Sequence, residues 1–280
     1  MSCSDTPDEF KASVERLSRD LREAAKTLST AEARFLVDSY YAMQEDRIRA
    51  AHQERKLGEG KEPHLIMQWL FAQRFVMEKQ VARALDVYSA NQPLGQWARS
   101  IVGIGPIIAA GLLAHIDIKH APTVGHIWSF AGLNPDSKWN KGEKRPHNAD
   151  LKRLCWLIGE SFVKVSGNER DIYGQVYKAR KEQEAAKNAA GEYAHLAVIS
   201  LATKKFGKDT EARKHYEAGK LPPARLHLRA QRYAVKLFLS HYHHVAYELA
   251  NGEPPPKPYV LSHGNHAHFI APPNWPMVAK

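Results

Sequence analysis

The sequence is poor in cysteine: its 280 residues hold two, Cys3 and Cys155. This number excludes a disulfide framework and a cysteine-rich zinc site. Cys155 lies within an apolar helical pattern, and we expect no bridge between the two thiols. A chain without disulfides suits a reducing compartment, so we expect a cytoplasmic protein.

Long hydrophobic runs are also missing. The longest apolar stretch, Ile101–Ile118, is interrupted by three glycines and by Pro106 and His115. It is too short and too broken to span a bilayer. The first thirty residues contain no apolar run, so we expect neither a signal peptide nor a membrane partner.

The first hundred residues lack any useful run in which apolar and polar residues alternate, as they do in a half-buried strand. Apolar residues recur at helical spacing instead, and the sequence predicts an all-α fold. Helices are predicted over Glu9–Leu28, Leu94–Ile101, Asn148–Val165 and Ala224–Leu249. Three more helices are predicted to start after a cap at Ser29 or Thr30, at Pro63 and at Pro106. The segment Glu169–Phe206 is predicted to form one helix, or two helices broken at Gly191.

Breaks in these patterns divide the chain into four predicted parts. Residues 1–93 form a helical arm, a candidate coiled-coil or dimerisation element. Residues 94–166 form a helix-hairpin-helix domain. Residues 167–252 form long basic helices, and residues 253–280 form a tail rich in proline and histidine. We expect this tail to lie extended on the body of the protein or to be partly disordered.

The excess of positive over negative charge is confined to one part of the sequence. The formal net charge is +10, yet residues 1–101 hold 15 basic and 15 acidic side chains. Residues 138–236 contain 22 basic and 11 acidic side chains. Such an asymmetry is typical of a nucleic-acid-binding part joined to a neutral part. A basic surface that serves only solubility is the alternative interpretation.

The segment Val102–Pro106, with the sequence VGIGP, is the most informative in the chain. A Gly-x-Gly turn leads into Pro106, which suits the first position of a helix. Glycines leave the backbone without Cβ atoms, so the N–H groups at the turn and at the helix start can approach a phosphate. The pattern predicts a helix-hairpin-helix that holds the nucleic-acid backbone without reading bases. A tight turn between two core helices is the alternative.

A basic loop and the helix after it supply further candidate contacts. Trp139 stands among lysines, where an aromatic ring suits stacking on an unpaired base. The predicted nucleic-acid-binding residues are Gly103, Ile104, Gly105, Lys138, Trp139, Lys141, Lys144, Arg145, Lys152 and Arg153.

The hairpin, the helix IIAAGLLAHI after it and the turn FAGLNP at Phe130–Pro135 together resemble a known family. They are similar to the C-terminal helix-hairpin-helix domain of the DEDD-type, bridge-RNA-guided insertion-sequence transposases. The resemblance covers Gln96 to Val165 and includes the Gly- and Lys-rich loop Lys138–Arg145. It implies nucleic-acid binding and a phage or mobile-element origin.

Two departures from the family limit what the resemblance implies. The family carries an N-terminal RNase-H-like domain with four catalytic carboxylates that hold magnesium, whereas residues 1–95 show no βαβ pattern. We expect that catalytic domain to be missing. The family also places a nucleophilic serine in the loop after the AGL.P turn. Here Ser137 is the only hydroxyl of the loop, and we expect it to be solvated rather than nucleophilic.

Histidine is abundant, with 15 residues. His263, His266 and His268 lie in the tail as an H-x-x-H-x-H cluster, and His241 and His244 share a helix face. Such a set could bind zinc with a further ligand, but no cysteine or carboxylate accompanies it. We therefore expect no metal and no cofactor, and a neutral tail packed on the helix.

These patterns favour a non-enzymatic DNA-binding protein related to insertion-sequence transposases, with RNA as an open alternative ligand. Its partner would be double-stranded DNA, and the arm would support a homodimer. The second hypothesis is a metal- or serine-dependent nuclease or recombinase acting on DNA. The third is an interaction protein whose basic face meets an acidic protein.

Overall fold

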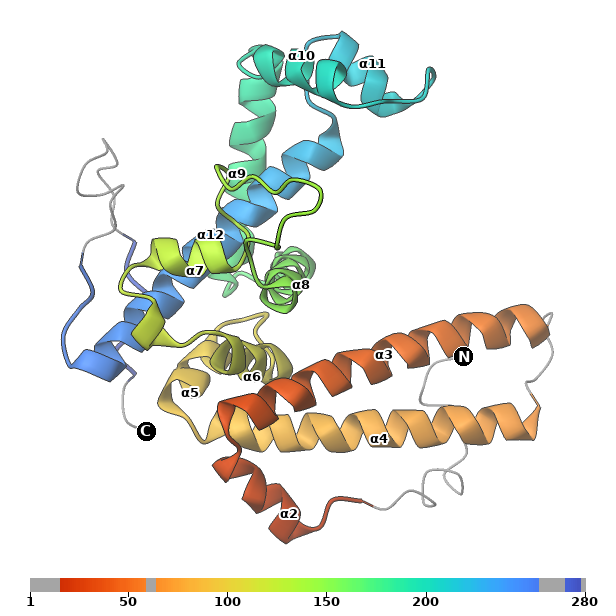
Figure 1. Ribbon diagram of the computed structural model, residues 1–280, viewed down its shortest axis with the longest axis vertical. Coiled ribbons are helices and arrows are strands. Elements are labelled where there is room, and N and C mark those ends of the chain that lie inside the picture. Colours follow the sequence, from red (N-terminus) through yellow and green to blue (C-terminus); the bar gives the residue numbers. More distant parts are fainter. Residues whose placement is uncertain (1–15, 59–63, 257–269, 278–280) are drawn as a thin grey trace. The chain divides into compact units, whose positions relative to one another are not determined.

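The computed structural model describes residues 16–58, 64–256 and 270–277. Within these ranges the chain is helical and contains no strand, which confirms the predicted all-α class (Figure 1). The elements in chain order are α2 (Arg19–Ala24), η1 (Ala25–Thr27), α3 (Thr30–Gly58), α4 (Leu65–Ala90), α5 (Pro93–Ser100), α6 (Pro106–His115), η2 (Ile118–His120), α7 (Val124–Phe130), α8 (Ala149–Val165), α9 (Ile172–Ala189), α10 (Ala194–Thr203), α11 (Glu211–Glu217) and α12 (Pro223–Asn251).

The described residues group into two compact units. The first unit contains α2 to α6, apart from the turn at Ser100–Ile104. The second contains that turn and the described chain from Ile118 onward. Helices α5 and α6 are therefore grouped with the arm helices α3 and α4. The four-part division at residues 93, 166 and 252 stays a prediction.

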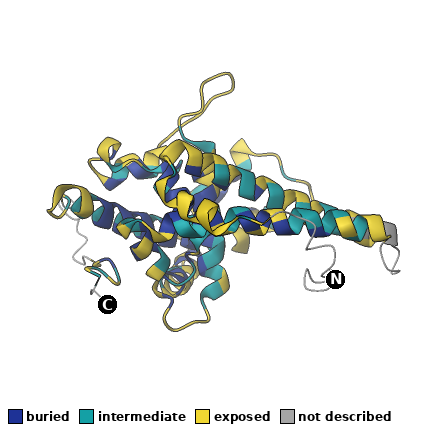
Figure 2. Ribbon diagram, turned by 90° about the horizontal axis from the view of Figure 1, so that it is seen from below, coloured by how far each residue is buried: buried dark blue, intermediate teal, exposed yellow. Residues whose placement is uncertain are grey.

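In the first unit, α3 and α4 lie antiparallel and side by side, and α6 packs against both (Figure 1). Arg47 of α3 holds the buried Glu78 of α4 through two hydrogen bonds, of 2.5 and 3.2 Å. Arg34 donates to the carbonyl of Ala114 at the end of α6 over 2.7 Å. Exposed residues recur along the α3–α4 hairpin (Figure 2).

Of the two predicted caps, Ser29 and Thr30, the structure uses Ser29, which forms a capping box with Glu32 at the start of α3. The Ser29 N–H donates to the Glu32 carboxylate over 2.8 Å, and the Glu32 N–H donates to the Ser29 hydroxyl over 3.3 Å. Both groups satisfy N–H donors that the helix itself leaves unpaired. The predicted start of the next helix, Pro63, lies outside the described residues; α4 begins at Leu65 after the cap His64.

The prediction of one helix over Glu9–Leu28 is wrong for the described part of that range. Residues 16 and 17 are not helical, and α2 begins only at Arg19. The Ser18 hydroxyl accepts the N–H of Leu21 over 3.1 Å, so this serine acts as an N-cap. Local capping therefore outweighed the apolar spacing on which the longer helix was predicted.

In the second unit, α12 packs against α7, α8 and α9. The apolar stripe predicted for the helix at Asn148–Val165 is buried along α8. Phe162 of α8, Tyr173 of α9 and Phe238 of α12 pack ring to ring, with centroids 4.9 to 5.6 Å apart. These three rings join α8, α9 and α12 in one core.

The segment after α9 forms a smaller packed group. Glu169–Phe206 is two helices broken near Gly191, where φ is +82°, in agreement with one of the two predicted alternatives. The side chain of Asn188 donates to the Leu221 carbonyl and accepts the Leu221 N–H, at 3.0 and 2.8 Å. Buried Glu184 bonds Arg180, Arg229 and Tyr193. The short helix α11 was not predicted.

The described end of the chain, residues 270–277, is irregular and held by polar contacts. The Ile270 carbonyl lies 2.9 Å from His241 Nε2, and the Trp275 indole N–H donates to Glu248 over 2.9 Å. Asn274 donates to the backbone and side chain of Ser100. No described helix is both long and apolar enough to cross a bilayer.

Candidate nucleic-acid interface

The turn between α5 and α6 is built around Gly103. The Ile104 N–H donates to the Ile101 carbonyl over 3.0 Å, and Gly103 has a φ of +93° in the third position of this turn. A positive φ at that position is the signature of a type II turn, which favours glycine. The side chain of Ile104 is buried, so its part in the turn is structural.

Gly103 also lies close to α8. The Ser161 hydroxyl donates to the Gly103 carbonyl over 2.6 Å. A Cβ atom at Gly103 would meet the side chains of Val165, Phe162 and Ser161 at 3.1 to 3.3 Å. The predicted phosphate contact at Gly103 is therefore not needed to explain why glycine occupies this position.

Gly105 differs from Gly103 in its backbone conformation and in the space around its Cβ position. Its φ of −84° and ψ of 174° are open to any residue, and a Cβ atom here would meet nothing within 4 Å. It is the N-cap of α6, and no side chain caps this helix end. Pro106 follows and has no N–H, so Ile107 and Ile108 carry the first N–H groups of the helix. Uncapped N–H groups and the helix dipole make this end suited to an anion.

The basic loop is closed at its base by backbone hydrogen bonds. Helix α7 ends in a Schellman motif, in which Gly132 has a φ of +65° and the Leu133 N–H donates to the Trp128 carbonyl over 2.8 Å. The loop returns where the Asn148 N–H donates to the Phe130 carbonyl over 2.9 Å. Asn148 then caps α8 by accepting the Leu151 N–H over 2.8 Å. Both ends of the loop are thus fixed to helices.

The tip of the loop is ordered around Trp139. Its indole N–H donates to the Glu143 carbonyl over 2.9 Å, and Arg145 lies over the ring, 5.2 Å from the centroid. The Glu143 carboxylate accepts both the backbone and the side-chain N–H of Asn140 at 3.0 Å. The side-chain bond from Asn140 is the main reason that the pKa of Glu143 is lowered. The only carboxylate between residues 138 and 145 is therefore committed to the turn.

Most of the remaining charges of the loop and of the start of α8 are positive, and the exceptions are the exposed Asp136 and Asp150. The exposed cations are Lys138, Lys141, Lys144, Arg145, Lys152 and Arg153. His147 lies among them, 3.4 Å from the Lys152 ammonium. Burial lowers the pKa of His147, and the charges of Lys152 and Arg145 lower it further. The two cations that add to this lowering indicate a locally positive potential, which favours an anion.

The predicted residues of the second unit thus occur in two settings. Gly103 and Ile104 lie in the turn beside α8, and the cations lie on the loop and at the start of α8. Gly105 belongs to the first unit. Ser137 is exposed, and no described side chain forms a hydrogen bond with its hydroxyl.

Two histidines of α12, His241 and His243, are buried in the core. His241 Nδ1 lies 2.7 Å from the Tyr173 hydroxyl and His243 Nε2 lies 2.8 Å from the Ala121 carbonyl. A carbonyl can only accept, so His241 carries its proton on Nε2, toward Ile270. Within the described ranges no three histidine, cysteine or acidic residues are grouped as metal ligands would be. His263, His266 and His268 lie outside the described residues.

Sequence reasoning missed three side chains that line a pocket beside the loop: Trp156, Arg232 and Lys236. One signal was present, because Arg232 and Lys236 are four residues apart and share a helix face. Nothing in the sequence shows that this face of α12 meets α8 at Trp156.

Comparison with known families places one segment of the chain. Residues 96–158, from α5 to α8, match the family described as Transposase IS116/IS110/IS902 family. This segment, less than a quarter of the chain, is related to insertion-sequence transposases. No curated protein and no solved structure is significantly similar to the chain.

Proposed function

We propose that this protein binds double-stranded DNA through its phosphate backbone. The open N-terminus of α6 at Gly105 would hold one phosphate, and the cations of the basic loop and α8 would neutralise others. Backbone contacts carry no base information, so binding would be nearly independent of sequence. The transposase-related segment suggests a phage or mobile-element origin.

The observation that carries this proposal is the concentration of anion-binding features in the matched segment. Residues 96–158 contain the uncapped helix start at Gly105 and all six exposed cations named above. The one carboxylate at the loop tip is turned toward Asn140. A segment related to proteins that move DNA thus presents positive charge where a phosphate could approach.

We further propose that the protein acts by binding rather than by catalysis. The residues of the site are cations and backbone N–H groups, which hold a phosphate but do not attack it. Ser137 has no described base beside it, and a serine needs such a base to become a nucleophile. The alternative, a nuclease or recombinase, is an outcome of the experiment below.

The experiment combines binding and cleavage on one substrate. Supercoiled plasmid is incubated with the protein and Mg²⁺ or Mn²⁺, and one half of each sample is stripped of protein before electrophoresis. We expect retarded plasmid in the untreated half and intact supercoiled plasmid in the stripped half. Nicking or linearisation that is lost in Ser137→Ala would contradict a purely binding role. Absence of any retardation would contradict DNA binding itself.

We also propose that the α3–α4 hairpin supports a homodimer. Large apolar side chains are exposed along it, and Phe35 is 70% exposed. Exposed apolar clusters on a soluble protein commonly mark an interaction surface. The others are Ile48, Leu65, Ile66, Trp69 and Met77.

A further inference from the structure

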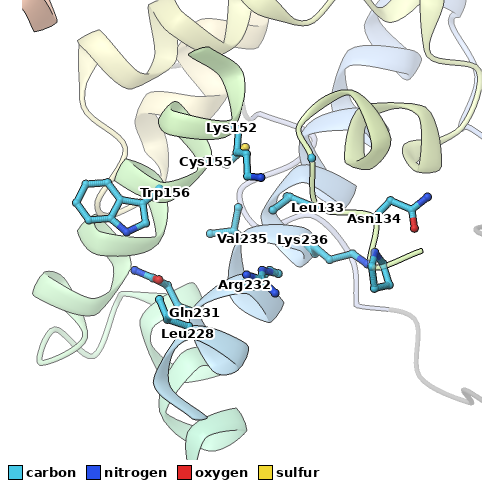
Figure 3. A pocket seen from close by; sticks show the side chains of 12 residues that line it. Leu133, Asn134, Lys152, Cys155, Trp156, Leu228, Gln231, Arg232, Val235 and Lys236 are labelled. Carbon is cyan, nitrogen blue, oxygen red and sulfur yellow. The ribbon is translucent and has the colours of Figure 1, made fainter. Parts of the chain in front are cut away.

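A pocket of about 330 Å³ lies beside the basic loop, within the second unit. Three elements form its walls: the turn at Gly132–Pro135, the first half of α8 and the first half of α12 (Figure 3). In Figure 3, Trp156 lies at one side of the pocket, and the side chain of Lys236 extends toward the turn at the other side. This volume is at the lower end of the range for small-ligand sites.

The pocket is positively charged. Lys152, Arg232 and Lys236 line it, and none of its lining residues is acidic. Arg232 and Lys236 are one helical turn apart, and like charges at this spacing destabilise a helix. No described carboxylate forms an ion pair with either of them. An anion between the two side chains would relieve this repulsion.

Lys236 is held in place by Trp128. Its ammonium lies 4.1 Å from the centroid of the Trp128 ring, and the Trp128 indole N–H donates to the Lys236 carbonyl over 3.2 Å. Burial lowers the pKa of Lys236, as does the charge of Arg232, whereas Asp136 raises it. The cation is thus positioned in advance rather than free to turn into solvent.

The pocket also has an apolar lining. Trp156 of α8 is 53% exposed, and Leu228 and Val235 of α12, the helix that carries Arg232 and Lys236, line the pocket as well. Gln231 Nε2 donates to Glu160 over 2.7 Å, which fixes the amide and leaves its carbonyl oxygen as an acceptor. Burial raises the pKa of the Cys155 thiol to about 12, so this cysteine is inert lining.

We propose that this pocket receives one unpaired nucleotide of a bound nucleic acid, with its base on Trp156 and its phosphate between Arg232 and Lys236. The inference rests on the proposed function and extends it to distorted or single-stranded sites. An aromatic platform beside cations is the arrangement by which proteins hold unpaired bases. Paired bases of a regular duplex offer no free face to Trp156.

The test compares two dye-labelled probes by fluorescence anisotropy: a fully paired DNA duplex, and the same duplex with a short single-stranded gap. We expect the gapped probe to bind about tenfold more tightly, as expected for one base stacked on an aromatic ring. Trp156→Ala should abolish this preference and change the affinity for the paired duplex less than about twofold. Trp156→Tyr should retain the preference, because it retains an aromatic ring.

Two further variants separate the pocket from general effects. Val198→Ala trims an exposed apolar side chain of α10 and should leave the preference intact. Arg232→Gln should weaken binding of the gapped probe and lower its salt dependence by about 0.7, the contribution of one phosphate on a single strand. Melting temperatures of all variants show whether each is folded.

The outcomes distinguish the two proposals. Equal affinity of the wild-type protein for both probes would overturn the pocket assignment and leave backbone binding intact. A preference for the gapped probe that survives Trp156→Ala would also overturn it, because the gap would then act through flexibility. Poly-glutamate that competes as well as oligo-dT would assign the pocket to an acidic protein. Failure to bind either probe would refute both proposals.

Discussion

Gly105 and Gly103 are two residues apart, yet the structure gives them opposite requirements. Gly105 has a common backbone conformation and open space at its Cβ position, whereas Gly103 has a φ of +93° and faces three side chains of the second unit. Of these two glycines, only Gly105 can therefore be substituted without disturbing the fold. This pair allows the proposed binding role of the turn to be tested separately from its structural role.

Gly105→Thr should weaken DNA binding about tenfold, since a branched side chain would block the phosphate from the N–H groups of α6 and remove charge-assisted hydrogen bonds. Stability should change by less than about 1 kcal/mol, because threonine is an N-cap comparable to glycine. Anisotropy titrations and thermal melts measure the two effects on the same protein. Unchanged affinity in the folded variant would show that the turn is only a connection.

Gly103→Ala is the matched variant and should do the reverse. It should destabilise the protein by about 1 kcal/mol or more, because alanine at a positive φ is strained and its Cβ is crowded. Affinity measured well below the lowered melting temperature should stay close to that of the wild type. Stability equal to that of the wild type would contradict the backbone conformation described for this turn.

The titration of His241 should make the free energy of unfolding depend on pH. Burial lowers the pKa of His241 to about 4 in the folded protein, and the bond to the Ile270 carbonyl opposes this shift only in part. The unfolded chain takes up this proton near pH 6.5, so unfolding becomes easier as the pH falls from about 6.5 to 4. The loss should total roughly 3 kcal/mol. Above pH 7 this contribution is complete.

Urea unfolding of the wild type and of His241→Gln across this pH range isolates the effect from other titrating groups, among them His243. The wild type should lose more stability on acidification than the variant. Parallel curves for the two proteins would show that His241 titrates normally.

At the scale of elements, the basic loop should act through charge alone. Lys141 and Lys144 are exposed, and no described residue pairs with them, whereas Arg145 also packs on Trp139. The double variant Lys141→Ala/Lys144→Ala should therefore leave stability unchanged. It should reduce the slope of log K against log salt by up to about 1.8 on duplex DNA.

Arg19→Ala/Arg22→Ala is the charge-matched control for the loop. It removes two exposed cations from α2, in the part of the chain with no net charge. Its salt slope should equal that of the wild type. An equal reduction in both double variants would indicate that net charge, and not the loop, sets the affinity.

The helices that the sequence predicted well are those whose signals are local. Pro106 at a helix start, the cap at Ser29 and the break at Gly191 each act within a few residues, and each occurs in the structure. The prediction of the first helix was wrong because the Ser18 cap and the apolar spacing are both local signals that favour different starting points for the helix. Packing decides between such weak local preferences, and a single sequence does not show the packing.

The candidate site was predictable only in part, for a similar reason. The charge and glycine patterns predicted the hairpin and the loop as candidate sites. They did not predict that the turn requires glycine at position 103 but accepts other residues at position 105. The crowding at Gly103 comes from Ser161 and Phe162, about sixty residues away. The pocket depends on α8 and α12 meeting, and Trp156 and Arg232 are too far apart in sequence for any spacing rule to link them.

At the scale of the whole molecule, the α3–α4 hairpin should make the protein a dimer. Phe35→Lys places a charge on its exposed apolar surface and should shift sedimentation toward the monomer at a fixed protein concentration. Leu21→Lys changes an exposed leucine of α2 and serves as the control. A wild-type protein that sediments as a monomer at all concentrations would refute the dimer.

The central claim is that the protein holds phosphates, and the salt dependence of duplex binding tests it most directly. Neutralisation of six phosphates predicts a slope of log K against log salt near −5, and a loss of affinity of about a thousandfold between 50 and 200 mM salt. Two duplexes of unrelated sequence should give the same slope and nearly the same affinity. A flat salt response, or strong binding to only one of the two duplexes, would contradict the account.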